Sequence, residues 1–241
     1  TPVISYWSTA ATLGSSVFSW FSRTIPTDDV MALAFSETVY GLGWRTIGML
    51  YIDDVYGAGI ASDVASNCGR LGISIITAQK HYDLDAQSIN DAVRNLKQTG
   101  TRIMILIFFP GSLTLILDAL EREGMTGPGY VVMVGDSAGD WELVVQGLPV
   151  TKAAHYRSLM HGWLQMLYNP LGDRGPRFQA AMKSTPFHVV DVPGLGITRE
   201  QMQDDFNEVC ALAYDATWTA ALGIDAAIRQ GTNTGDVVNT K

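Results

Sequence analysis

Three continuous apolar runs constrain the fold of this chain more than any other feature. They are IGMLY at residues 47–51, IMILIFF at 103–109 and YVVMV at 130–134. A strand with one solvated face alternates apolar and polar residues, whereas a strand that is covered on both faces is apolar throughout. Segments of helical length and periodicity separate these runs. The sequence therefore predicts an α/β fold, in which helices cover both faces of a parallel sheet.

The expected elements alternate regularly through the middle of the chain and less regularly at its two ends. The expected strands are 3–6, 20–24, 45–51, 73–79, 102–108 and 130–134. The expected helices are 27–41, 57–71, 87–99, 112–123 and a short one near 141–146. After residue 150 we expect one more strand within 161–168, a short helix over 174–183 and a long apolar-faced helix over 203–229.

Composition excludes several classes of function. The chain has 241 residues, 47% of them apolar, and a net charge of −8 without a Lys/Arg cluster. Nucleic acids and anionic membrane surfaces are therefore not expected partners. The longest apolar run, 102–110, has the length of a strand and not of a membrane span. The first residues resemble a core strand and lack both an initiator Met and a signal-peptide pattern, so we expect a fragment of a longer chain.

The two cysteines, Cys68 and Cys210, lie in separate helical patterns without metal-ligand spacing. Two buried thiols are the favoured interpretation, and a disulfide between them is the alternative. No metal or cofactor is expected. Motifs of nucleophilic hydrolases, phosphate-binding loops, zinc proteases and dinucleotide-binding enzymes are all absent, which argues against an enzyme.

Polar residues follow two of the predicted strands at the same edge of the sheet. Asp53, Asp54 and Tyr56 follow strand 45–51, and Asp136 follows strand 130–134. Ligands of α/β proteins bind at this carboxyl edge. From chemistry alone, a helix cap beside a packing tyrosine and a turn aspartate are the favoured interpretations, and an amine or acid–base site is the alternative.

Three longer stretches carry a resemblance to a known family. They are PVISYWSTAATL at 2–13, FSRTIPTDDVMALAFSETVYGLGWRTIGMLYIDDVYGAG at 21–59 and YDATWTAALGIDAAIRQG at 214–231. In this order they resemble the receptor-family ligand-binding region, which has the type I periplasmic-binding-protein fold. The middle stretch is closer to the eukaryotic receptors for glutamate, GABA and natriuretic peptides than to bacterial amino-acid-binding proteins.

The resemblance implies two lobes that close on a ligand. Residues 28–165 would form a complete lobe 2, while 1–27 and 166–241 would belong to a partial lobe 1. The strand–helix units that precede PVISY in the family are missing from this chain. The long helix over 203–229 should therefore expose an apolar patch, which invites aggregation or a partner.

The resemblance also implies ligand-binding residues. Thr9, with Ser8 beside it, matches the hydroxyl that follows the first strand. Tyr56 matches the tyrosine that flanks the ligand from lobe 2. Asp136 matches an aspartate that pairs with the ligand's amino group, and Asp28 a hinge-side aspartate. Trp7 departs from the family, which has smaller residues there.

The expected function is an extracellular sensor domain of a membrane receptor that binds a small amino-acid-like ligand, with a homodimer as a further expected assembly. Three alternatives stay open: a periplasmic solute-binding protein of an amino-acid transporter, a lobe that dimerises or binds a peptide without an interlobe ligand, and, least favoured, an enzyme using Asp53 and Asp136.

Overall fold

The computed structural model describes residues 2–135, 141–168, 176, 177, 180 and 208–229. The chain divides into two compact units. Unit 1 combines Thr1–Pro26 with Asn169–Lys241, and unit 2 is the continuous segment Thr27–Tyr168. None of the helices in the described part of the chain has the length and apolar character needed to cross a membrane.

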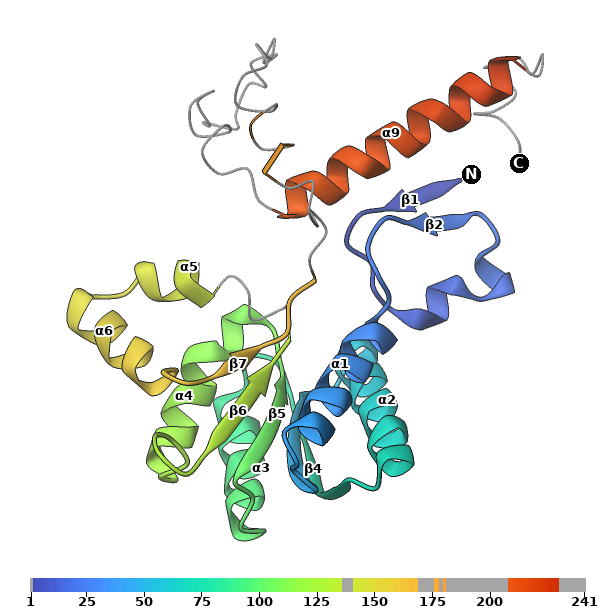
Figure 1. Ribbon diagram of the computed structural model, residues 1–241. Coiled ribbons are helices and arrows are strands. Elements are labelled where there is room, and N and C mark those ends of the chain that lie inside the picture. The colour runs from blue at the N-terminus through green and yellow to red at the C-terminus, as the bar shows by residue number, and fades with distance from the viewer. Residues whose placement is uncertain (1, 136–140, 169–175, 178–179, 181–207, 230–241) are drawn as a thin grey trace. The chain divides into compact units, whose positions relative to one another are not determined.

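Unit 2 contains a parallel sheet of five strands, as the apolar runs predict (Figure 1). Its strand order is β4-β3-β5-β6-β7, so the chain enters near one side of the sheet and finishes at the other. The strands are β3 (Thr46–Ile52), β4 (Ser74–His81), β5 (Ile103–Ile107), β6 (Val131–Val134) and β7 (Leu164–Gln165). The pairs β3–β5 and β5–β6 match Met49 with Ile105 and Ile105 with Met133, so three apolar residues form a row across the sheet.

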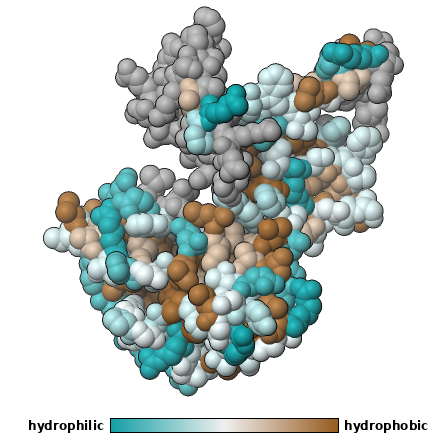
Figure 2. Space-filling model, viewed as in Figure 1, coloured by the Kyte–Doolittle hydropathy of each residue, from teal (hydrophilic) through white to brown (hydrophobic). Residues whose placement is uncertain are grey.

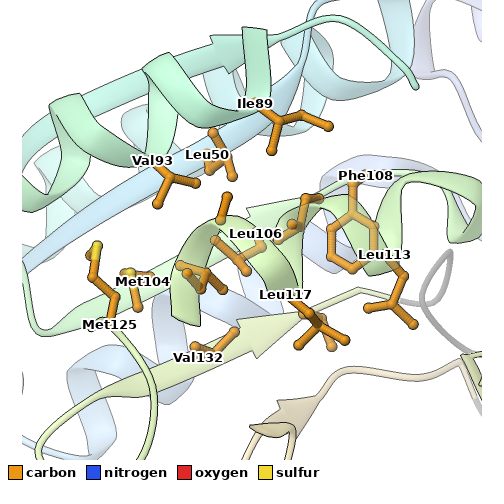
Figure 3. Packing of buried hydrophobic residues seen from close by; sticks show 14 of the residues in the cluster. Leu50, Ile89, Val93, Met104, Leu106, Phe108, Leu113, Leu117, Met125 and Val132 are labelled. Atoms are coloured by element: carbon orange, nitrogen blue, oxygen red, sulfur yellow. The ribbon is translucent and has the colours of Figure 1, made fainter. Parts of the chain in front are cut away.

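Helices cover both faces of this sheet, and each face has its own apolar core. Helices α1 (Asp28–Gly41) and α2 (Val55–Leu71) cover one face, where Phe35 and Val64 pack with Met49. Helices α3 (Ala86–Gln98), α4 (Leu113–Arg122) and α6 (Val150–Leu159) cover the other. Figure 3 shows part of this core, with Val93 of α3 and Leu117 of α4 among the packed side chains. Leu50 and Leu106 are fully buried there. Because neighbouring residues of a strand point to opposite faces, the two cores require the continuous apolar runs.

Three elements of unit 2 differ from expectation. Helix α2 begins at Val55, two residues before the expected start. The strand expected within 161–168 is shorter, because β7 pairs with β6 only at Met133↔Leu164 and Val134↔Gln165. Helix α6 was not expected, although the short helix α5 (Trp141–Gln146) lies where it was expected.

Unit 1 contains a two-stranded parallel sheet and a long helix. Strand β1 (Val3–Ser5) pairs with β2 (Phe21–Arg23), and the short 3₁₀ helices η1 (Ala11–Gly14) and η2 (Ser16–Phe18) lie between them in the chain. Helix α9 (Glu208–Arg229) is joined to the strand region by Thr24, whose Oγ1 donates to the carbonyl of Leu212 at 3.0 Å. Most of the helix expected over 174–183 lies outside the described residues. Within this range the structure describes residues 176, 177 and 180, and all three are helical.

The predicted apolar patch on α9 is confirmed. Ala211, Leu212 and Ala216 are buried, whereas Trp218 and Leu222 are 51% and 61% exposed. The other exposed apolar residues of this helix are Tyr214, Ile224 and Ile228. Hydrophobic and hydrophilic residues are also mixed over the visible face of unit 2 (Figure 2).

Candidate functional site

The turn between β3 and α2 is a helix cap in the structure. Asp54 is the N-cap residue of α2, and its carboxylate accepts a hydrogen bond from the amide of Gly57 at 2.7 Å. The backbone of Gly57 lies so close to the end of β3 that a Cβ at this position would be 2.1 Å from the carbonyl oxygen of Ile52. Only glycine fits here without a shift of the backbone. The favoured interpretation of this turn, an acidic cap beside a packing tyrosine, is therefore confirmed. The cap also explains why α2 begins at Val55.

Asp53 is occupied by a lysine of the neighbouring strand. Its carboxylate lies 2.9 Å from Nζ of Lys80 on β4, in a pair that is open to solvent. This hydrogen bond and charge raise the pKa of the Lys80 ammonium. Both carboxylates thus have a partner in the structure, the Lys80 ammonium for Asp53 and the Gly57 amide for Asp54.

Tyr56 forms an aromatic wall with a residue that the sequence did not single out. Its ring stacks on Phe109 with the ring centres 5.4 Å apart and the planes inclined by 19°. Tyr56 lies in the first turn of α2, and Phe109 follows β5, so both lie at the carboxyl edge of the sheet. The signal available in the sequence was that the apolar run 103–109 ends in Phe109.

Asp28 is the first residue of α1 and is 5% exposed. Because α1 ends just before the amino end of β3, it begins at the same edge as α2. The structure thus brings Asp28 and Tyr56 to one edge of unit 2. Asp136 lies outside the described residues.

Buried hydrogen bonds hold the loops that follow β4 and β5 at this edge. Ser112 is fully buried; its hydroxyl donates to Asp83 at 2.7 Å and accepts from the amide of Leu84 at 2.9 Å. His81, the last residue of β4, is 1% exposed, and its Nδ1 lies 3.1 Å from the carbonyl of Tyr82. Burial lowers the pKa of His81, so its ring is neutral at neutral pH.

Ser8 and Thr9 lie in a hydroxyl-rich turn of unit 1. Ser5, at the end of β1, accepts hydrogen bonds from the amides of Trp7 and Ser8 and donates one to Oγ of Ser8 at 2.8 Å. A hydroxyl has one proton and can accept in addition, so Ser8 keeps its own proton for another acceptor. Both Ser8 and Thr9 are partly exposed. This geometry can donate hydrogen bonds to a carboxylate.

Arg23 holds this turn in place and was missed by the sequence analysis. Its Nη1 donates to the carbonyls of Ser8 and Ala10, each at 3.0 Å, from the end of β2. Its Nη2 is buried without a hydrogen-bond partner among the described residues. The signals in the sequence were a charged residue inside a short strand and its place at the start of the family-like stretch 21–59.

The described part of the chain contains no group of three His, Cys, Asp or Glu side chains that could hold a metal ion. Cys68 is a free, buried thiol next to Ser36, and burial raises its pKa. The side chain of Cys210 lies outside the described residues.

A parallel sheet with helices on both faces and polar turns at its carboxyl edge defines a class of α/β proteins that bind ligands at that edge. The family match is more specific. The model of the "Receptor family ligand binding region" matches residues 1–240, so the chain belongs to this family, which has the type I periplasmic-binding-protein-like fold.

Relatives of the chain are receptors and not enzymes. It is 23% identical to Glutamate receptor 3.4 of Arabidopsis thaliana over 96% of its own length and 22% of the relative. It is 21% identical to Metabotropic glutamate receptor-like protein E of Dictyostelium discoideum over 95% of its length and 27% of the relative. A 30% identity to the probable metabotropic glutamate receptor mgl-1 of Caenorhabditis elegans covers 57% of the chain and 16% of the relative. The chain thus spans about a quarter of these relatives or less.

Proposed function

We propose that this chain is part of the extracellular sensor domain of a membrane receptor and that it binds a small amino-acid-like ligand between two lobes. Unit 2 would be lobe 2, and unit 1 the part of lobe 1 that this chain supplies. The observation that carries the proposal is the family match over residues 1–240, together with relatives named as glutamate receptors.

The chemistry at the two edges supports an amino-acid ligand. The Ser8–Thr9 turn offers hydroxyl donors for a carboxylate, and Arg23 fixes that turn. The stacked rings of Tyr56 and Phe109 offer an apolar, π-rich wall for an ammonium group or a side chain. In this proposal Asp28 and Asp136 complete the amine site with negative charge. The ligand stabilises closure because it binds the closed state more tightly than the open one.

Thermal unfolding against a panel of α-amino acids and simple amines tests the proposal. A ligand at a hundred times its dissociation constant stabilises the folded state by about 2.7 kcal/mol. That should raise the melting temperature by roughly 5–10 °C for a chain of this size. The measurement is made on this chain and on a longer version that supplies the strand–helix units expected before Val3.

Two tyrosines of unit 2 make a matched pair of variants. Tyr56→Ala should weaken an amino-acid ligand about 5- to 30-fold, since it removes a desolvated cation–π contact. Tyr40 lies at the C-terminal end of α1, at the other end of this helix from Asp28, and is 44% exposed. Tyr40→Ala should therefore leave the affinity for the amino acid unchanged. If no compound of the panel shifts either folded version, the amino-acid proposal fails and a peptide or protein partner becomes the better hypothesis.

A further inference from the structure

The segment after β5 presents an aromatic residue at the edge where the amino-acid site is proposed. Phe109 is partly exposed, and its ring lies nearly parallel to that of Tyr56, with the ring centres 5.4 Å apart. Tyr56 is also partly exposed and packs against the core beneath α1 and α2. Phe109 therefore lies on the same side of the sheet, and the two rings form one apolar surface at the carboxyl edge of unit 2.

The aspartates near this surface already have partners within unit 2. Asp54 and Asp85 accept hydrogen bonds from backbone amides as the N-caps of α2 and α3. Asp53 pairs with Lys80, and Asp83 accepts from a buried serine hydroxyl of the loop after β5. The carboxylates of the segments after β3 and β4 are thus engaged in holding the loops.

Side chains that these segments leave open to solvent include large apolar ones. Val55, directly before Tyr56, is 71% exposed, and Leu84 is 63% exposed. Leu84 has a φ of 56°, which residues other than glycine rarely adopt, and its amide donates to Oγ of Ser112. Its side chain reaches the loop after β5, because a Cβ on Gly111 would lie 3.2 Å from its Cδ2. The carboxyl edge therefore offers an apolar surface to a ligand.

The segments that follow the strands of unit 2 contain no lysine or arginine. In chain order they read DDVY at 53–56, YDLD at 82–85, FPGS at 109–112, GDSAGD at 135–140 and MLY at 166–168. Lys80, near the end of β4, is paired with Asp53. His81 is neutral because burial lowers its pKa. A carboxylate on the side chain of a ligand would lose hydration here without gaining a cation from these segments.

We propose that the amino-acid ligand carries an apolar side chain and that Phe109 selects for it by direct contact. This inference rests on the proposed amino-acid site and adds the class of ligand: phenylalanine and similar apolar amino acids bind better than glutamate. In this arrangement the ring of Tyr56 lies against the ammonium group, and the ring of Phe109 lies against the side chain.

Isothermal titration calorimetry with phenylalanine, alanine and glutamate tests the ligand class, on this chain and on the longer version described above. We expect phenylalanine to bind at least about tenfold more tightly than glutamate, because the charge of glutamate stays uncompensated. If glutamate binds as tightly as phenylalanine, the ligand class is wrong while the amino-acid site stands. If no amino acid binds, the proposed function fails and this inference fails with it.

Variants of Phe109 separate contact with the ligand from support of the fold. Phe109→Ala should weaken phenylalanine about three- to tenfold and leave alanine unchanged, because only the larger side chain reaches this ring. Phe109→Lys should reverse the preference in favour of glutamate, since it supplies the missing cation. Tyr40→Ala should change neither affinity. Equal losses for phenylalanine and alanine in Phe109→Ala would overturn the proposed selection, and so would an unchanged preference in Phe109→Lys.

Discussion

At the scale of single residues, two carboxylates that are neighbours in the sequence have different roles because their side chains lie in different surroundings. Asp54 caps α2 within the turn, whereas Asp53, one residue earlier, pairs with Lys80 in solvent. Asp54→Ala should lower the free energy of unfolding by about 1 kcal/mol, as loss of a helix cap does. Asp53→Ala should change it little, because exposed ion pairs contribute little. Urea unfolding of both variants measures the difference, and equal losses would contradict these roles.

Two glycines of α2 make a second matched pair. Gly57→Ala should destabilise the chain by about 1–3 kcal/mol or more, since its Cβ would overlap the carbonyl of Ile52. A Cβ at Gly59 meets nothing within 4 Å, so Gly59→Ala should stabilise α2 by about 0.5–1 kcal/mol through helix propensity. Thermal unfolding of the two variants should therefore show shifts of opposite sign.

His81 makes stability depend on pH. Burial lowers its pKa in the folded state, while Asp83, Asp54 and the carbonyls of Tyr82 and Ile107 oppose this to a smaller extent. At a pH below about 6.5, the ordinary pKa of histidine, this group therefore binds more protons in the unfolded chain than in the folded one. The contribution of neutral His81 to the free energy of unfolding is full above that pH and is lost as pH falls. We expect stability to decrease between pH 7 and 5 by up to about 1.4 kcal/mol per pH unit from this group.

Urea unfolding at several pH values tests this role of His81. His81→Gln should flatten the pH dependence, and His155→Gln, which replaces an exposed histidine, should keep it. An unchanged slope in His81→Gln would assign the effect to other groups.

At the scale of elements, helix α6 shows where sequence patterns are insufficient. Among its ten residues only Ala153 and Tyr156 are buried, so it lacks the repeating apolar face that predicts a helix. It is held by a tertiary contact instead, because Tyr156 is 1% exposed and its hydroxyl donates to Asp118 of α4 at 2.7 Å. The central strands β3, β5 and β6, by contrast, lie within about two residues of their predicted positions, since burial on both faces makes each of them a continuous apolar run.

Tyr156→Phe tests this contact. Removal of a hydroxyl that donates to a carboxylate should cost about 1–2 kcal/mol. Burial and the hydrogen bond to Asp118 raise the pKa of Tyr156 to about 12, so its contribution is full below about pH 10 and is lost as pH rises toward 12. Chemical denaturation at pH 7 and 11 measures both effects. A cost below about 0.3 kcal/mol at pH 7 would show that packing alone holds α6.

At the scale of the whole molecule, the sequence led to the family and the residue types, but not to an assembled site. Ser8 and Thr9 lie in unit 1, Asp28 and Tyr56 in unit 2, and Asp136 outside the described residues. Hydrophobic periodicity depends on local burial, whereas a ligand site depends on contacts between residues that lie far apart in the sequence. The family resemblance supplied that expectation, and Arg23 and Phe109 became visible only through their contacts.

The apolar stripe of α9 predicts self-association. Tyr214, Trp218 and Leu222 follow one another at four-residue spacing and are all exposed. Such a surface favours association. The double variant Trp218→Gln with Leu222→Gln should reduce concentration-dependent association in sedimentation velocity. Val150→Gln, an equally polar change at a single exposed residue of unit 2, should not. Identical sedimentation of all three proteins would show that α9 does not mediate association.

The shortness of β7 has a consequence for how unit 2 opens. Two residues pair it with β6, the amide of Met166 adds a hydrogen bond to Val134, and unit 2 ends at Tyr168. This strand is therefore the least anchored in the sheet, and its amides should exchange with deuterated solvent well before those of β3 or β5. Local opening of unit 2 would then start at the strand next to the boundary between the two units, while the central strands stay closed.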